Sequence, residues 1–236
     1  MTFLCSAFLI IATWVCAKSP QPPISTFSIV ARDTKTGELG VAVQSKFVAV
    51  GSVVPYARAG IGAIASQAWG NPRYGPVGLE LLASGKSAME AVDLMTSADP
   101  HRNSRQLAII GTEGNASVFT GTECLEWAGG KQGVNYAVQG NILTGSKVIE
   151  AMGKAFEDTN GTLAERMIAS LHAGQKFGGD KRGRQSAALL VVREGWGYGG
   201  LTDRFRDLRV DDHSDPIEEL ERIYYLHRKI FPRPEQ

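Results

Sequence analysis

The sequence predicts an α+β protein with two sheets, each covered by a pair of helices, in a four-layer αββα sandwich. Runs of strand-like segments are interrupted by pairs of amphipathic helices, and the single strand–helix alternation of a doubly wound sheet is absent. Glycine accounts for 27 of 236 residues, about 11% against roughly 7% in ordinary proteins. These glycines follow no Gly-X-Y period, so they indicate many turns and close backbone approaches, which favours a sheet-rich fold.

The first half of the folded region is expected to contain four strands followed by two helices. Two apolar segments flank a turn at Thr36-Gly37, as in a β-hairpin. Ser87 and Glu90 form a capping box, which predicts the start of the second helix. The expected strands are 26–33, 40–46, 52–56 and 60–66, and the expected helices are 77–82 and 87–94.

The second half is expected to contain three or four strands, two helices, two further strands and a last helix near the C-terminus. Thr162 and Glu165 form another capping box, and Pro216 suits the first turn of the last helix. The expected strands are 106–111, 116–120, 134–139, 186–193 and 207–211, and the expected helices are 146–158, 162–175 and 217–230. Two sheets, each with a helix pair, account for this order.

The N-terminal segment predicts export. Residues 1–17 carry no charge, are largely apolar and end in Val15-Cys16-Ala17, which is typical of a signal peptide of a secreted or periplasmic protein. The absence of a basic start leaves an uncleaved anchor as the alternative. Residues 18–25 are a proline-rich leader, and 26–236 are expected to form one domain. Signal removal would leave Cys124 as the remaining cysteine, so no internal disulfide is expected.

Charge and motif content exclude several functions. The formal net charge of +1 offers no general field for nucleic acid or an anionic membrane, so neither is an expected partner. Nucleotide-binding, GxSxG, HExxH and paired CxxC motifs are absent, and the four histidines have no ligand spacing. We therefore expect no metal and no organic cofactor. The acidic run 211–215 favours a solvated turn, because adjacent residues there point in different directions.

The start of the folded region is the strongest candidate for chemistry. Thr26 opens the first strand directly after the proline-rich leader. If the Ser25–Thr26 bond were cut, Thr26 would carry an α-amine beside its hydroxyl, and the amine could act as the general base for the hydroxyl. The reference pKa of an α-amine, about 7.7–8.0, suits a base near neutral pH. The structural alternative is that Thr26 simply starts a strand as a β-branched residue.

The run STFSIVARDTKTGELGVAVQSKF, with the later YAVQGNIL and GGDKRGRQSAALLVV, closely resembles a known family. It is the domain of unknown function 1028 family, which is assigned to the N-terminal nucleophile (Ntn) hydrolase superfamily. The resemblance covers Ser25 to about His227, nearly the whole mature chain. It independently implies the αββα fold, but it does not supply a reaction, because the substrate of that family is not established.

A more distant resemblance to proteasome β-type subunits and asparaginase-like enzymes implies catalytic roles. It implies Thr26 as the nucleophile and Asp180 as a nearby carboxylate, and Asn141, in Gln139-Gly140-Asn141, could supply an oxyanion donor. Lys46 is a further catalytic candidate, since its charge near the Thr26 amine could lower the pKa of that amine. It follows the second strand, where proteasome subunits carry an aspartate, so the mechanism does not transfer directly. Each partner has a structural alternative: a solvated charge for Lys46, a loop contact for Asn141 and an arginine pair for Asp180.

Four further residues are candidates for substrate binding. Ser66 and Gln67 end a glycine-rich strand and could line a cleft, although buried structural polar groups are the alternative. Arg58 and Arg184 could bind an anionic group of a substrate, and a surface salt bridge explains each of them equally well.

The sequence therefore predicts a secreted, autoprocessing Ntn-type amidohydrolase that cleaves an amide or peptide-like bond in a small molecule or peptide. Ser25 would be the nucleophile if processing occurred one residue earlier. The alternative is a secreted binding or structural module that has kept the fold without catalysis. Homo-oligomerisation would cover the strand edges that such sheets expose.

Overall fold

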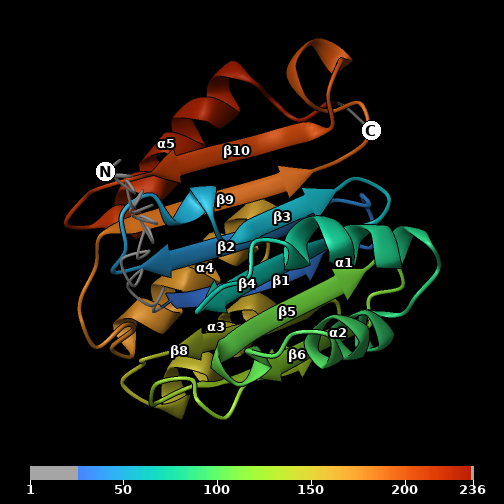
Figure 1. The fold of residues 1–236 in the computed structure, drawn as a ribbon. Helices are drawn as coiled ribbons and strands as arrows, with labels where there is room; N and C mark the ends of the chain where they lie inside the picture. Colours follow the sequence, from blue (N-terminus) through green and yellow to red (C-terminus); the bar gives the residue numbers. More distant parts are fainter. Residues whose placement is uncertain (1–25, 235–236) are drawn as a thin grey trace, which may run out of the picture.

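The computed structural model describes residues 26–234, which form two antiparallel sheets and five α-helices (Figure 1). The mixed α+β class is therefore confirmed. The predicted signal peptide 1–17 and leader 18–25 lie outside the described residues. Within residues 26–234, no helix combines the length and the apolar character needed to cross a membrane.

The six-stranded sheet has the order β10-β9-β2-β1-β8-β7, with β1 and β2 near its centre. Its strands are β1 (Thr26–Arg32), β2 (Leu39–Ser45), β7 (Gly129–Gly133), β8 (Tyr136–Asn141), β9 (Ser186–Val192) and β10 (Arg204–Val210). The four-stranded sheet has the order β3-β4-β5-β6. Its strands are β3 (Pro55–Arg58), β4 (Gly62–Ala68), β5 (Arg105–Gly111) and β6 (Ala116–Thr120).

The helices cover the outer faces of the two sheets (Figure 1). They are α1 (Tyr74–Ala83), α2 (Ala88–Ser97), α3 (Ser146–Asp158), α4 (Leu163–Lys176) and α5 (Pro216–Ile230). Helices α3, α4 and α5 pack on the six-stranded sheet, and α1 and α2 pack on the four-stranded sheet. Both predicted capping boxes are present, at Ser87–Glu90 and Thr162–Glu165.

Side-chain alternation along β1 separates two hydrophobic cores. Phe27, Ile29 and Ala31 are buried beneath α3, α4 and α5. Val30 points the other way, into a second core shared with Ala63 and other residues of the four-stranded sheet. Because successive side chains of a strand point to opposite faces, Thr26 and Ser28 also lie on the side that faces the second sheet.

The structure differs from the sequence-based prediction in three local features. The segment 52–56 was expected to be a strand, but a 3₁₀ turn (Val50–Ser52) precedes β3 there, and buried Val50 and Val54 point into the inter-sheet core. Strand β7 was not expected, because its sequence GGKQG has no apolar residue, and it exists through pairing with β8. Helix α1 begins at Tyr74, earlier than the apolar run that predicted it.

A buried arginine and a histidine join β10 to α5. Arg206 is 1% exposed, and its Nη1 lies 2.9 Å from Nδ1 of His227. Since a guanidinium can only donate, Nδ1 is the acceptor, and the proton of the neutral imidazole is on Nε2. Burial lowers the pKa of His227, and the neighbouring Arg206 charge lowers it further. The neutral imidazole is therefore the form that this contact stabilises.

We predict that protonation of His227 destabilises the folded protein. Because the folded-state pKa of His227 is below its ordinary value of about 6.5, the unfolded chain takes up this proton at a higher pH than the folded chain. The stabilisation is complete above the unfolded value and is lost as the pH falls through the folded-state pKa. Urea denaturation at two pH values, on either side of the ordinary pKa, should show a greater loss of stability in the wild type than in His227→Gln. Equal losses would contradict this.

Candidate active site

The first residue of β1 lies at one end of the six-stranded sheet, between the ends of its two neighbouring strands. Thr26 is paired in register with Ser45 of β2 on one side and with Asn141 of β8 on the other. All three residues are buried, and Thr26 is 0% exposed. The Thr26 hydroxyl donates a hydrogen bond to Oγ of Ser45 at 3.2 Å. The sheet register thus places two hydroxyl groups and a carboxamide together.

A chain of buried amides connects this end of the six-stranded sheet to the four-stranded sheet. Gln67, on β4, donates from Nε2 to the carbonyl oxygen of Thr26 at 3.2 Å and to Oε1 of Gln106 at 2.8 Å. Asn141 donates from Nδ2 to the same Gln106 oxygen at 3.0 Å. Gln106, on β5, in turn donates to the carbonyl oxygen of Gly140 at 2.8 Å. These bonds hold Thr26 and Asn141 against the opposite sheet.

Two further polar side chains extend this network away from Thr26. The Ser28 hydroxyl donates to Oε1 of Gln67 at 2.7 Å, and Gln139 donates to the carbonyl oxygen of Ala65 at 2.9 Å. Beyond them the space between the sheets is filled by aliphatic side chains. The inter-sheet layer is therefore polar near Thr26 and apolar farther along the strands.

Gln67 and Asn141 were predicted as site residues, whereas Ser28, Ser45 and Gln106 were not. A signal for them existed, because a glutamine recurs near the ends of four strands, at positions 44, 67, 106 and 139. Side-chain alternation places Gln67, Gln106 and Gln139 between the sheets. Gln44 lies two residues after Ala42 and therefore on the helix-covered face. Register decides which of these glutamines meet.

Asp180 closes this end of the sheet through a loop that follows α4. Asp180 is buried, with 3% of the residue exposed. Its carboxylate accepts hydrogen bonds from the backbone N–H groups of Lys46 at 3.0 Å and Arg182 at 2.8 Å. It also forms an ion pair with the Arg182 guanidinium at 3.1 Å. Gly178 reaches this loop with a φ of 107°, in the region that favours glycine, and a Cβ there would lie 2.4 Å from Oγ1 of Thr144. Asp180 therefore fixes the backbone directly after Ser45.

Lys46 and Arg184 lie together beside the Asp180 loop, but their side chains point to other partners. Lys46 is exposed, and its ammonium donates to the carbonyl oxygen of Arg184 at 3.3 Å. The Arg184 guanidinium forms an ion pair with Asp215. In this arrangement Lys46 contacts Asp180 through its backbone, and its charge is directed to the chain that leads into β9.

Two of the residues predicted to bind substrate, Ser66 and Arg58, are not brought to Thr26 in the structure. Ser66 lies two residues after Ile64, so its side chain points to the same face of the sheet, the face covered by helices. Its hydroxyl exchanges hydrogen bonds with the backbone of Asn71. Arg58 lies at the hairpin end of β3, paired with Gly62 at the far end of β4 from Gln67, and it forms an exposed ion pair with Glu80. Gly62 and Gln67 are five residue steps apart along the strand, roughly 16 Å.

One group of side chains within residues 26–234 has the composition of a metal site. His172 of α4 and Glu218 and Glu221 of α5 bring their ligand atoms within 4.8 Å of one another. The Nε2 of His172 lies 2.9 Å from a Glu221 carboxylate oxygen, so an interhelical ion pair accounts for the arrangement when the histidine is protonated. This group shares no residue with the Thr26 site.

The fold and the buried polar site define a two-sheet α+β protein with a strand-initiating threonine at the junction of the sheets. The chain belongs to the Family of unknown function (DUF1028), whose model matches residues 26–220. It is similar to the crystal structure of protein SPO2555 from Silicibacter pomeroyi, described as family-model DUF1028, with 33% sequence identity, coverage of 86% of each chain and a TM-score of 0.80.

A much weaker likeness links the chain to Anbu (ancestral beta-subunit) from Yersinia bercovieri. The identity is 12%, the coverage is 89% of this chain and 99% of that chain, and the TM-score is 0.39, which carries no argument about fold or function. The search of curated proteins found no match.

Proposed function

We propose that this chain is an Ntn-type amidohydrolase whose nucleophile is Thr26, made N-terminal by cleavage of the Ser25–Thr26 bond. The observation that carries the proposal is the position of Thr26, which starts a central strand with its hydroxyl 3.2 Å from Oγ of Ser45. Its side chain lies on the face that carries the polar inter-sheet network. The arrangement of two helix-covered sheets supports the proposal, since it has the layer order expected of an Ntn-type αββα sandwich.

The Thr26 hydroxyl would attack the carbonyl carbon of an amide, while the α-amine of Thr26 accepts the hydroxyl proton. That proton would then pass to the leaving nitrogen as the C–N bond breaks, which leaves an acyl ester on Thr26. Water would hydrolyse the ester and restore the threonine. No step requires a metal or organic cofactor, and the same ester chemistry at Ser25 would remove the leader.

Neighbouring residues have distinct roles in this proposal. Asn141 is the candidate oxyanion donor, since its carboxamide lies directly across the strand pair from Thr26. Gln67 positions Thr26 by binding its carbonyl oxygen. Asp180 and Lys46 act as positioning residues, because Asp180 holds the Lys46 backbone and so fixes the end of β2 beside Thr26. Arg184 remains the candidate for binding an anionic substrate group at the edge of the site.

The setting that we propose is extracellular or periplasmic, with residues 1–17 as the signal peptide and an amide or peptide as the substrate. Strands β7 and β10 are the outer strands of the six-stranded sheet among the described residues, so association of copies through them is part of the same proposal.

An amide-hydrolysis assay tests the catalytic role directly. Protein that begins at Thr26 should hydrolyse at least one member of a panel of N-acyl amino acids and aminoacyl nitroanilides. Thr26→Ala should reduce the rate by roughly a thousandfold or more, as expected for loss of a covalent nucleophile, and Thr26→Ser should retain measurable activity. Unprocessed protein, assayed before cleavage at Ser25–Thr26, is the matched control, because it has the hydroxyl but not the free α-amine. Equal rates in wild type and Thr26→Ala would contradict the proposal, and inactivity of both towards the whole panel would favour a non-catalytic module.

A further inference from the structure

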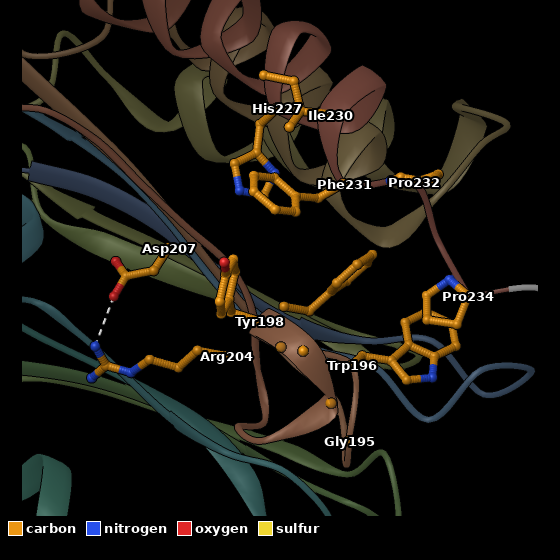
Figure 2. A pocket seen from close by; sticks show the side chains of 14 residues that line it. Gly195, Trp196, Tyr198, Arg204, Asp207, His227, Ile230, Phe231, Pro232 and Pro234 are labelled. Atoms are coloured by element: carbon orange, nitrogen blue, oxygen red, sulfur yellow. Dashed lines mark hydrogen bonds and ion pairs between the residues drawn. The ribbon is translucent and has the colours of Figure 1, made fainter.

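An aromatic pocket of about 390 Å³ lies where the loop between β9 and β10 meets the C-terminal end of α5 (Figure 2). The sheet register places it far from Thr26. Thr26 and Ser186 lie at one end of the sheet through their pairing with Ser45, whereas Val192 and Arg204 pair at the other end. A strand of seven residues separates these ends, roughly 20 Å. The pocket is therefore a site separate from the proposed nucleophile.

Exposed aromatic rings form the walls of this pocket. Tyr198 is 78% exposed and Phe231 is 39% exposed, and their ring centroids lie 6.0 Å apart in an edge-to-face arrangement. The ring of His227 lies 4.8 Å from that of Phe231. In Figure 2, Tyr198 and Trp196 extend from the loop between β9 and β10, and His227 and Phe231 from the end of α5. Preformed aromatic walls with a few polar groups are typical of small-molecule sites.

Positive charge lies behind these walls. The Arg206 guanidinium is 3.7 Å from the centroid of the Phe205 ring, and no carboxylate among residues 26–234 forms a salt bridge with it. The guanidiniums of Arg193 and Arg233 lie 4.6 Å and 5.2 Å from the ring of Trp196. A buried cation with no carboxylate in direct contact favours a nearby anion, although the charge of Glu38 also acts on Arg206.

The carboxylate of Asp207, at the mouth of the pocket, does not neutralise the positive charge around it. Asp207 accepts from Arg204 at 2.8 Å, as the dashed line in Figure 2 shows, and also from Arg209 at 3.0 Å. One carboxylate is thus shared by two guanidiniums, which leaves this group with an excess positive charge. Behind the pocket, Glu38 is already bound by Arg233.

His227 supplies a hydrogen-bond donor at the pocket wall. Its Nδ1 accepts from Arg206, so its Nε2 carries the proton and is the donor that remains. The contact with a guanidinium polarises the imidazole and strengthens this donor. The pocket therefore combines aromatic surface, a donor and a positive field.

We propose that this pocket binds a small aromatic carboxylate, with its ring packed against Tyr198 and Phe231 and its carboxylate near His227 and Arg204. The aromatic side chains would pack against the ring of the ligand, and the positive charges would attract its carboxylate. A neutral aromatic compound would make only the packing contacts, and a simple inorganic anion would make only the electrostatic contacts. The proposal does not depend on Thr26 being a nucleophile.

Binding of benzoate to the full-length protein tests this inference, with benzamide as the neutral ligand of the same shape. Calorimetry or ligand-observed NMR should show saturable benzoate binding and at least tenfold weaker binding of benzamide, because a hydrogen bond to a charged group is stronger than one to a neutral group. Tyr198→Ala should weaken benzoate binding by about threefold to tenfold through loss of the ring contact.

Leu201→Ala is the matched control. Leu201 belongs to the same loop and is 91% exposed, but it does not line the pocket, so its removal should leave the benzoate affinity unchanged. No saturable binding, equal affinity for benzamide or an equal loss in Leu201→Ala would overturn the proposal. Self-association that needs Tyr198 and is unaffected by benzoate would also overturn it, because it would assign this wall to a contact between copies.

Discussion

Replacement of Gln106 with leucine is expected to lower the free energy of unfolding by about 3–5 kcal/mol. Gln106 is 0% exposed, and its Oε1 accepts from both Gln67 and Asn141. Its Nε2 donates to the carbonyl oxygen of Gly140 and to Oγ1 of Thr120. Leucine has a similar size but none of these groups, and each buried polar partner left unsatisfied costs about 1–3 kcal/mol.

Urea denaturation and thermal unfolding measure this effect. The midpoint temperature should fall by roughly 10 °C, given about 2–4 °C per kcal/mol for a chain of this size. Gln185→Leu is the matched control, because the Gln185 side chain makes one hydrogen bond, to Asp212 at the exposed surface, and its loss should change stability far less. If Gln106→Leu were no more destabilising than this control, the buried network would not be holding the two sheets together at the candidate site.

Most of the secondary structure could be predicted because local patterns determine it. The two capping boxes place the starts of α2 and α4 correctly, and the apolar strand that includes Leu189 and Leu190 is recognised from its composition alone. Strand β7 could not be predicted, since Gly129–Gly133 has no strand-like pattern of its own. Its pairing with β8 depends on tertiary contacts that a short window of sequence does not contain.

The candidate site could be predicted only in part, for a similar reason. Thr26 and Gln67 stand out because each lies at or near the end of an apolar strand, and Asn141 stands out through the distant resemblance; the structure brings the three together. The sequence did not separate the roles of Ser66 and Gln67, which are adjacent at a strand end, whereas in the structure their side chains point to opposite sides of the sheet.

Long-range register accounts for the residues that were missed. Ser45 contacts Thr26 because β1 and β2 pair in one particular alignment, and Gln106 contacts Asn141 because the two sheets pack face to face. Neither alignment is encoded within a single segment. The side-chain partner of Lys46 is likewise a carbonyl oxygen from a segment that is distant in sequence, at Arg184.

Cleavage between Ser25 and Thr26 is expected in the wild-type protein and is expected to be lost completely in Thr26→Ala. The Thr26 hydroxyl would attack the carbonyl carbon of Ser25, the C–N bond would break as the nitrogen takes up a proton, and water would hydrolyse the resulting ester. Alanine has no oxygen for this attack, whereas Thr26→Ser keeps the hydroxyl and should still cleave. Ser45→Ala should slow cleavage, because the Thr26 hydroxyl donates to Oγ of Ser45.

The intact mass of the purified protein, measured for the wild type and for Thr26→Ala during incubation at neutral pH, tests the central claim most directly. The account predicts that the wild type converts to a chain that begins at Thr26, while the Thr26→Ala variant keeps every residue between the signal-cleavage site and position 26. A wild-type chain that permanently retains Ser25, and that hydrolyses amides as fast as Thr26→Ala does, would contradict it.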